Sequence, residues 1–435
     1  MSTYRFIMRN YHAVKEADIE IAGMTVVGGV NGCGKSTLAR WLNYVVNVLN
    51  NYDRYVIDDA RRSYKELIQV ISRASNISLT LRMEWRKENA RFTSSYDLSE
   101  LQSYFHMLVD RFVEMMTEKL RSRIWQLNRR RLSSLFDLEE KEGESLSDFL
   151  SRLTDYLYTE DDKIYSIAIE RLERHSMKNW REILLDRIDL NIDSSRIDLE
   201  FTEDSVTLLG DKEFSLPLML HNAVYINTQE ISATLGSSLY ESGDLSQLLQ
   251  TKAEQSTVQG RVLAKIIKSI IGGEVVIDTN VFADRRDRLR FVRPDGLDIL
   301  LRGAATGIIS FAILLQLLEN GWITENTMLI IDEPEAHLHP QWIVEYARVL
   351  VKINKTLGTK ILVSTHNPDM LAALQSISER EGTLNESCFY LAEKTDEDGR
   401  YYYRKLGKEV GPIFDSFNIA LDRIELYGMS GPYLE

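Results

Sequence analysis

Hydrophobic and polar residues follow two different periods along the chain, and these periods divide it into regions. Near the N-terminus the pattern predicts strands over Tyr4–Met8, Asp18–Ile21 and Met24–Val27, followed by a helix that begins at Ser36. Over the last third, segments of helical and strand length alternate, and the strands read "MLIID" and "KILVST". This alternation is typical of βαβ units around a parallel sheet.

The middle of the chain has helical periodicity instead. From about Leu98 to Ile192, apolar residues recur at helical spacing, as in "ELQSYFHMLVDRFVEMM" and "SLSDFLSRLTDYLYTE". We therefore expect an α/β core that is assembled from both ends of the chain, with a large helical lobe inserted between them. The expected boundaries are 1–95 for the N-terminal half with its β-lobe, 96–195 for the insertion, 196–380 for the C-terminal half and 381–435 for the completing strands and helix.

Composition narrows the class of protein. The chain has 435 residues, of which 44% are hydrophobic and 27% are charged, and this predicts a globular protein rather than a disordered one. No apolar run reaches the length of a bilayer span, and the N-terminus lacks the layout of a signal peptide. The only two cysteines, Cys33 and Cys388, cannot form a disulfide framework. We expect a cytoplasmic location and no membrane partner.

The charge distribution leaves binding of nucleic acid open. A net charge of −13 argues against general affinity for phosphate backbones. Two basic runs, within Lys119–Arg131 and Arg285–Arg293, could still form a local patch on an acidic body. The ordinary explanation of such runs is a solvated helix face or an exposed hairpin. DNA or RNA therefore remains an open partner class.

A glycine-rich loop carries the strongest chemical signal. The stretch "GGVNGCGKST" follows a buried strand and opens a helix, which is the context that a phosphate-binding P-loop requires. Backbone N–H groups of such a loop cradle phosphates, Lys35 reaches the β- and γ-phosphates, and the Ser36 hydroxyl binds Mg²⁺. The sequence thus predicts ATP and Mg²⁺ as ligands, bound through Gly29, Asn31, Gly32, Cys33, Gly34, Lys35, Ser36 and Thr37.

An acidic pair ends one of the buried strands. In "MLIIDEPEAHLHP", Asp332 comes at the C-terminal end of an apolar run, where ligands bind in open α/β sheets. We expect Asp332 to hold Mg²⁺ and Glu333 to polarise an attacking water. A solvated acidic turn is the alternative, and the P-loop upstream argues against it. His339 precedes Pro340 and predicts a helix start rather than a metal site.

A histidine follows the next strand. "KILVSTHNPDML" places His366 directly after the strand, and Asn367 with Pro368 predicts a capped helix start. Parallel strands would bring Lys35, Asp332 and His366 to one edge of the sheet. A lone histidine is usually structural, but at this edge we expect His366 to sense the γ-phosphate.

These motifs, in this order, resemble those of ABC-type ATPase heads of the RecF and SMC-like group. The resemblance is closest to bacterial ATPases of the OLD and anti-phage defence kind, which include the ATPase subunits of Septu, PARIS and some retron systems. It covers roughly residues 1–50 and 220–380. It implies an α/β fold, namely an ABC-type head with a P-loop sheet and a flanking β-lobe, in which two heads sandwich two ATP molecules.

The resemblance also implies a segment that faces the partner's P-loop. Its match, "ATGIIS", begins at Ala305, where the family usually has a serine, and Thr306 replaces the first glycine of the family pattern. Thr306 and Gly307 are therefore the expected contacts to the partner's ATP, and an ordinary threonine cap followed by a core helix is the less favoured alternative. The family's glutamine loop further implies Gln229 as a residue that senses Mg²⁺ and water.

The resemblance implies slow ATP hydrolysis by a head-to-head dimer that controls a partner. OLD relatives carry a nuclease domain after the head, and the residues that follow the His366 helix are too few for one. We therefore expect the effector, for example an HNH nuclease, to be a separate protein. Two alternatives remain: a RecF-like DNA-repair ATPase, and a non-hydrolysing scaffold that assembles when ATP binds.

Overall fold

The structure is a computed structural model in which two compact units are distinguished. One comprises residues 1–50 and 188–435, and the other comprises residues 51–187. Among the described helices, none combines the length and apolar content that crossing a bilayer requires. The residues described are 4–76, 82, 97–119, 122–141, 143–174, 198–203, 206–207, 219–228, 244–253, 257–278, 289–395, 398–408 and 410–415.

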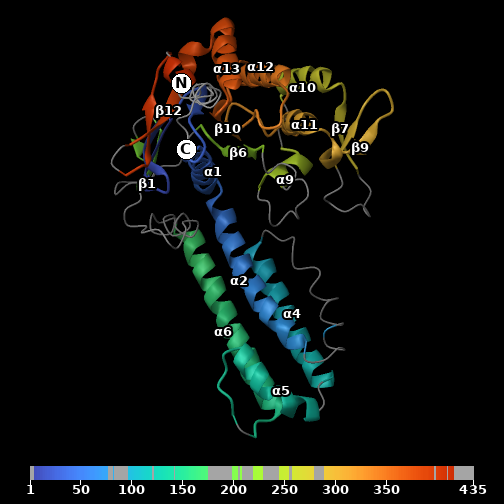
Figure 1. Cartoon of the computed structure of the whole chain (residues 1–435). Coiled ribbons are helices and arrows are strands. Elements are labelled where there is room, and N and C mark those ends of the chain that lie inside the picture. The colour runs from blue at the N-terminus through green and yellow to red at the C-terminus, as the bar shows by residue number, and fades with distance from the viewer. Residues whose placement is uncertain are drawn as a thin grey trace, which may run out of the picture. The chain divides into compact units, whose positions relative to one another are not determined.

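The first unit is built on a ten-stranded sheet with the order β5-β4-β1-β2-β13-β12-β3-β11-β10-β6 (Figure 1). The strands β12, β3, β11, β10 and β6 pair in parallel with one another, β12 pairs antiparallel with β13, and the antiparallel pairs β1–β2, β1–β4 and β4–β5 extend the sheet as a β-lobe. The strand bounds are β1 Tyr4–Tyr11, β2 Val14–Ile21, β3 Met24–Gly28, β4 Asp198–Glu203, β5 Val206–Thr207, β6 Asn222–Asn227, β10 Thr327–Asp332, β11 Lys360–Thr365, β12 Ser387–Lys394 and β13 Tyr401–Lys405.

Helices cover both faces of the parallel part. Alternate residues of β3, β6, β10 and β11 share one hydrophobic core with the helices that follow residue 257, whereas α1 contacts β6, β10 and β11 outside that core. Burial on both faces explains why all six residues of β10 are buried. The helices are α1 Lys35–Asn50, α9 Asp244–Gln250, α10 Val258–Ile271, α11 Thr306–Glu319, α12 Pro340–Leu357 and α13 Pro368–Glu381.

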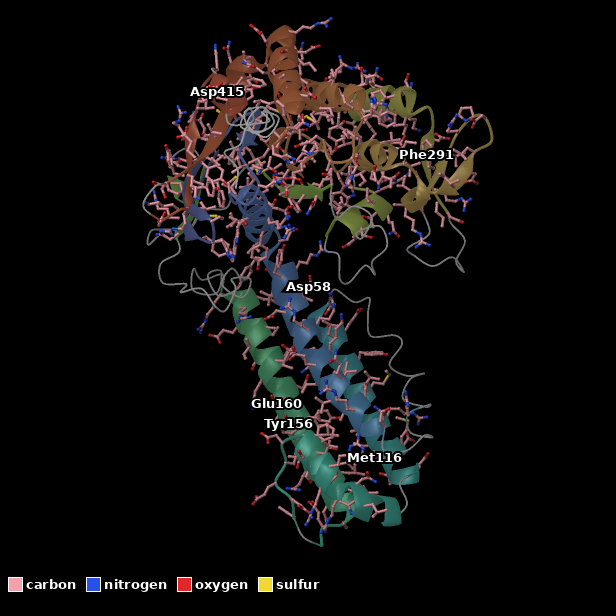
Figure 2. The ribbon with its side chains drawn as sticks, in the orientation of Figure 1. Asp58, Met116, Tyr156, Glu160, Phe291 and Asp415 are labelled. Atoms are coloured by element: carbon pink, nitrogen blue, oxygen red, sulfur yellow. The ribbon has the colours of Figure 1, made fainter. Side chains whose placement is uncertain are left out.

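Three short strands form a second sheet in this unit, in the order β7-β8-β9. Their bounds are β7 Glu274–Ile277, β8 Leu289–Val292 and β9 Asp298–Leu300. Two short 3₁₀ helices complete the unit: η4 Leu301–Gly303 directly after β9, and η5 Leu384–Glu386 between α13 and β12. Phe291 of β8 is buried in the main core and is labelled beside this second sheet in Figure 2. The expected architecture of a P-loop sheet, a flanking β-lobe and an inserted helical unit is confirmed.

The helical unit contains α2 Tyr52–Ser75, α4 Leu98–Lys119, α5 Ser122–Leu135 and α6 Leu146–Glu173. Its side chains, among them Met116 and Tyr156, are drawn along the helices in Figure 2. The unit begins at Asn51 and not at residue 96 as the periodicity suggested. The reason is that Tyr64, Ile68 and Ile71 of α2 belong to the same core as α4 and α6.

A buried carboxylate joins the three long helices of this unit. Asp161 of α6 is 1% exposed. It accepts hydrogen bonds from Tyr64 Oη of α2 (2.7 Å) and Gln102 Nε2 of α4 (3.0 Å), and it lies 2.6 Å from His106 Nε2. Burial and the bond to this carboxylate raise the pKa of Tyr64 well above its ordinary value. Asp161 therefore fixes how α2, α4 and α6 meet.

Replacing Asp161 tests this role. Asp161→Ala leaves the Tyr64 hydroxyl buried without its acceptor, so we expect the free energy of unfolding to fall by about 2–3 kcal/mol. The neighbouring Asp162 is exposed, and Asp162→Ala should stay within about 0.5 kcal/mol of the parent. Urea denaturation of the full chain, followed by circular dichroism, measures both. Equal midpoints for the two variants would contradict the assignment.

Candidate functional site

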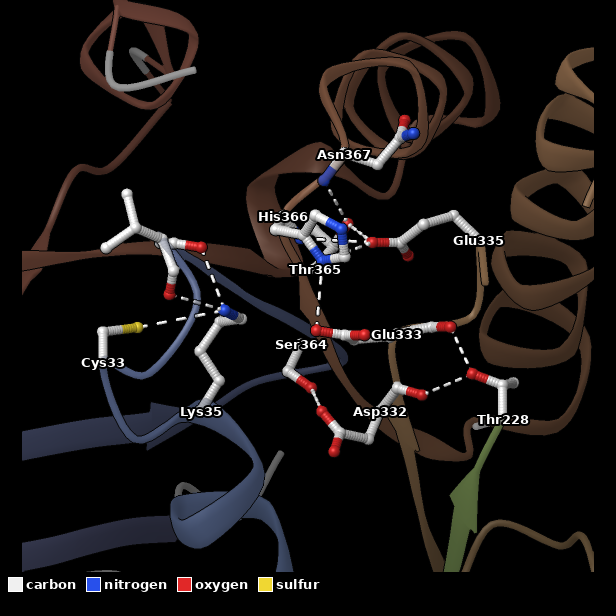
Figure 3. Close-up of polar contacts among 12 residues, drawn as sticks. Cys33, Lys35, Thr228, Asp332, Glu333, Glu335, Ser364, Thr365, His366 and Asn367 are labelled. Atoms are coloured by element: carbon white, nitrogen blue, oxygen red, sulfur yellow. Dashed lines mark hydrogen bonds and ion pairs between the residues drawn. The ribbon is translucent and has the colours of Figure 1, made fainter. Parts of the chain in front are cut away.

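The register of the parallel strands brings four chain segments to one edge of the sheet. Gly28 pairs with Thr365, and Asp332 pairs with both Ser364 and Asn227. The loop after β3, the acidic residues after β10, His366 after β11 and Thr228 after β6 therefore leave the sheet side by side. Figure 3 shows the polar groups that meet there.

Lys35 is folded back over the glycine loop. It is 4% exposed, and its Nζ donates to the carbonyl oxygens of Gly29 (2.9 Å) and Val30 (3.0 Å). Cys33 Sγ lies 3.9 Å from the same nitrogen. The ammonium group is thus held inside the loop whose backbone the sequence predicts to cradle phosphate, as Figure 3 shows.

Side chains of β2 and β13 contact this loop. Gly34 has φ 98°, and a Cβ there would lie 2.6 Å from Val14 Cγ2 of β2, so only glycine fits. Tyr403 of β13 donates from its hydroxyl to Cys33 O at 3.0 Å. Burial raises the pKa of Tyr403 well above its ordinary value, so this hydroxyl remains a donor. The hydrophobic periodicity of β13 does not predict the contact between Tyr403 and Cys33.

Asp332 is held by hydroxyl groups from two neighbouring strands. It is 2% exposed. Ser364 Oγ of β11 donates to its Oδ1, and Tyr225 Oη of β6 donates to its Oδ2 at 3.1 Å. Arg40 Nε of α1 donates in turn to Tyr225 Oη at 3.3 Å. Both carboxylate oxygens are therefore oriented at the strand end where the sequence predicted a metal ligand.

Glu333 adopts a backbone conformation that is unusual for its residue type. Its φ is 50°, in the left-handed region that favours glycine. Its N–H donates to Ser364 O at 2.9 Å, and its carbonyl accepts hydrogen bonds from Thr228 Oγ1 and from Ala336 N (3.0 Å). These bonds hold the strained turn, and the side chain of Glu333 reaches the His366 ring, as seen in Figure 3.

His366 lies between two carboxylates. Its Nδ1 is 3.0 Å from Glu333 Oε1 and 3.5 Å from Glu335 Oε1. Asn367 caps α13 by accepting from Met370 N at 3.0 Å, with Pro368 in the first turn, as the sequence predicted. His339 likewise caps α12 ahead of Pro340. The arrangement can position a water or a phosphate oxygen beside Glu333 and His366.

The N-terminus of α11 lies near the acidic turn. Its first residue, Thr306, is exposed, and its hydroxyl lies 3.4 Å from His337 O. The preceding Ala305 makes no side-chain cap. Gly307 is required by close packing, because a Cβ there would lie 2.8 Å from the Trp342 ring. The first-turn N–H groups of α11 therefore have no side chain from the capping position to bond.

Gln229 and the two basic runs lie wholly or partly outside the described residues. Gln229, the proposed glutamine-loop residue, lies outside the described residues, as do most of the basic side chains of the two runs. In the described part of those runs, Arg290 pairs with Asp298 and Arg293 with Asp295, while Arg129 and Arg130 both contact Glu140. Three carboxylates thus pair with four of the five arginine side chains that the structure describes in these runs.

Comparisons with known proteins agree with the motifs. Residues 1–371 match the AAA ATPase domain family. The Old nuclease of Escherichia phage P2 is 33% identical over 78 residues, which are 17% of this chain and 13% of that protein. The chain therefore matches only a small part of the length of this curated relative.

Two solved structures match the chain at low similarity. The SMC head domain from Thermotoga maritima has a TM-score of 0.37 and 9% identity, covering 93% of this chain and 99% of that one. An Smc head domain with an extended coiled coil, derived from Pyrococcus furiosus and bound to the C-terminal domain of ScpA, has a TM-score of 0.34 and 11% identity, covering 98% and 100%. Because both TM-scores are low, the fold is described from the strand order and register given above and not from these two structures.

The backbone of Glu333 supplies a test of the site geometry. The φ of Glu333 is 50°, and a Cβ is strained in this left-handed region. We therefore expect the free energy of unfolding of Glu333→Gly to be about 1 kcal/mol higher than that of Glu333→Ala. The same pair of substitutions at Glu345, inside α12, should show the opposite order by about 1 kcal/mol. Urea denaturation of the four variants measures this. The same order at both positions would refute the left-handed turn.

Proposed function

The chain belongs to the AAA ATPase domain family, and we propose that it is an ABC-type ATPase that binds ATP with Mg²⁺ and hydrolyses it slowly between two copies of itself. One observation carries this proposal. Lys35, Asp332, Glu333 and His366 come from three separate strand ends and lie along one edge of the sheet. A phosphate chain at this edge would meet each group that phosphoryl transfer requires.

Nucleotide binding falls to the loop after β3. Backbone N–H groups of the loop, together with the first turn of α1, offer donors to phosphate oxygens. Lys35 Nζ bonds the carbonyl oxygens of Gly29 and Val30, and we propose that it exchanges these partners for the β- and γ-phosphates. Cys33 and Tyr403 keep the loop in shape, since the Tyr403 hydroxyl bonds the Cys33 carbonyl.

The donor groups fit Mg²⁺. The ion prefers hard oxygen ligands, and the Asp332 carboxylate is available at the strand end with both oxygens oriented by hydroxyl groups. We propose that Asp332 and the Ser36 hydroxyl hold Mg²⁺, with Gln229 as a further contact. When bound, the ion neutralises negative charge on the phosphates.

Hydrolysis is assigned to Glu333 and His366. We propose that the Glu333 carboxylate accepts a proton from the attacking water. The proposal is supported by the left-handed turn at Glu333 and by the 3.0 Å contact between its Oε1 and His366 Nδ1. His366 is 40% exposed at its side chain and faces the same edge, so we propose that it contacts the γ-phosphate. Thr228 holds the carbonyl groups of Asp332 and Glu333 and so fixes the direction in which both side chains leave the strand.

The second copy completes the site. The first turn of α11 begins at the exposed Thr306 and carries N–H groups that no side chain at the capping position bonds, and we propose that it contacts the γ-phosphate held by the partner's P-loop. Ala305 supplies no hydroxyl there, and Thr306 is the nearest replacement. Loss of one charge-stabilising donor lowers turnover by about 10²–10³-fold in other enzymes, which favours slow hydrolysis here.

The biological setting that we propose is control of an effector. The Old nuclease is a nuclease by name, and we propose that this chain is the ATPase subunit of an anti-phage defence complex whose nuclease or toxin is a separate protein. A RecF-like grip on DNA through the two basic runs is the alternative. A neighbouring gene that encodes an HNH or other nuclease would support the proposal, and its absence from related loci would count against it.

Glu333→Gln separates binding from hydrolysis. The amide keeps the size of the side chain but cannot accept the proton, so we expect the hydrolysis rate to fall on the order of 10²–10⁴-fold. ATP binding and ATP-dependent dimerisation should persist. Phosphate release, equilibrium binding of a fluorescent ATP analogue and light scattering measure these three properties. Lys35→Ala serves as the control, because it should lose binding as well. An unchanged hydrolysis rate in Glu333→Gln would remove Glu333 from the mechanism.

Mixed dimers test the trans contact. Thr306→Asp places a negative charge at a helix N-terminus, which stabilises the helix by about 0.3–1 kcal/mol but repels the partner's phosphate. This variant should bind ATP as a lone subunit and fail to hydrolyse it, while Thr306→Ser stays active. Mixing Thr306→Asp with Lys35→Ala should restore hydrolysis, because one intact P-loop then meets one intact α11. Full activity of Thr306→Asp alone would mean that the segment is only a core helix.

A further inference from the structure

Glu335 is a buried acid beside the site to which no role has been assigned so far. It belongs to the turn that follows Glu333, and the residue is 6% exposed. Its Oε1 accepts a hydrogen bond from Thr365 Oγ1 (2.7 Å) and another from the backbone N–H of His366 (3.1 Å). The same oxygen lies 3.5 Å from His366 Nδ1. These three contacts of the carboxylate are all made with the Thr365–His366 strand end, as Figure 3 shows.

Among the described residues, the second oxygen of Glu335 is buried and has no hydrogen-bond partner. Burial raises the pKa of Glu335, although the bonds from Thr365 and His366 oppose the shift. An unsatisfied buried oxygen destabilises a fold. A carboxyl group retained under this penalty needs another explanation than stability, and its contacts point to the histidine.

The turn itself does not require the carboxylate. Its closing hydrogen bonds are made by the backbone, from Ala336 N to Glu333 O and from Leu338 N to Glu335 O, both at 3.0 Å. The side chain of Glu335 instead crosses to the next strand. It therefore connects the segment that carries Glu333 with the segment that carries His366.

His366 needs such a connection because its ring is only partly enclosed. Its side chain is 40% exposed, and its Nδ1 lies 3.0 Å from Glu333 Oε1 and 3.5 Å from Glu335 Oε1. Thr365 Oγ1, which donates to Glu335, also accepts from Asn367 N at 3.0 Å. One hydroxyl thus ties the Glu335 carboxylate to the capping residue of α13, on the far side of the histidine.

We propose that Glu335 is a positioning residue for His366, which fixes the backbone and the ring of the histidine against Glu333 so that both face the γ-phosphate of ATP. The proposal rests on the proposed ATPase function. Glu335 acts through His366 and does not itself contact the substrate.

A double-mutant cycle measures this action. Glu335→Ala should lower kcat about 10–100-fold with little change in KM for ATP, because a displacement of about 1 Å in a catalytic group has an effect of this size. In a His366→Ala background the same substitution should change kcat by less than about twofold, since the two residues then act as one unit. Equal losses in both backgrounds, or a change in KM alone, would overturn the proposal.

Two further variants separate positioning from general damage. Glu335→Gln keeps a carbonyl oxygen for Thr365 Oγ1 and His366 N, so it should recover most of kcat. If it is as slow as Glu335→Ala, positioning through these hydrogen bonds is wrong. Glu345→Ala, also a glutamate-to-alanine change but on the partly exposed side of α12, should leave kcat unchanged. Urea midpoints of all variants identify any that fail to fold.

A readout without nucleotide keeps the two proposals distinguishable. With isotope-labelled histidine, the Cε1–Hε1 resonance of His366 is assigned as the one that His366→Ala removes from the seven in the chain. Glu335→Ala should shift this resonance, and Glu345→Ala should not. If the parent protein hydrolyses no ATP but the resonance shifts, the ATPase function fails while the positioning contact stands. An unshifted resonance overturns the positioning role whatever the hydrolysis rate.

Discussion

The whole site depends on one hydrogen-bonded ladder, in which β3, β11, β10 and β6 pair in parallel and in register. Parallel strands all end at the same edge, so the ladder converts four distant stretches of sequence into one row of loops. Burial of both faces, by α1 on one side and by the helices after residue 257 on the other, makes the register strict. A slip of one residue would turn Asp332 away from Ser364 and Tyr225.

Much of this could be predicted from sequence because the relevant signals are local. The glycine spacing before Lys35, the apolar run that ends at Asp332 and the Asn367–Pro368 helix start each follow from neighbouring residues. The structure places these elements as expected. The extent of the helical unit was less visible, because α2 is assigned to it only through packing against α4 and α6, which are distant in sequence.

The supporting residues could not be predicted, for a physical reason. Tyr225 and Ser364 are ordinary strand residues and Thr228 directly follows a strand. Their roles arise from cross-strand register, and no pattern within their own segments distinguishes them. The φ of 50° at Glu333 is likewise held by bonds to Ser364 and Thr228 in two other segments and to Ala336 in its own turn. Glu335 lies in the same motif as Asp332 and Glu333, but its contact is with Thr365 on another strand, 30 positions away, which no local pattern indicates.

The position of β3 in the sheet has a consequence for how the protein is made. This strand carries the P-loop and leaves the ribosome early, yet its two neighbours are β11 and β12, and the register pairs Gly28 with Thr365 and Leu391. Leu391 follows Gly28 by 363 positions, which take roughly 20–70 s to translate at about 5–20 residues per second. For most of that time the apolar strand has neither of its pairing partners. The nascent chain therefore depends on whatever covers β3 in the interval, and a chaperone that binds extended apolar segments would meet its substrate there.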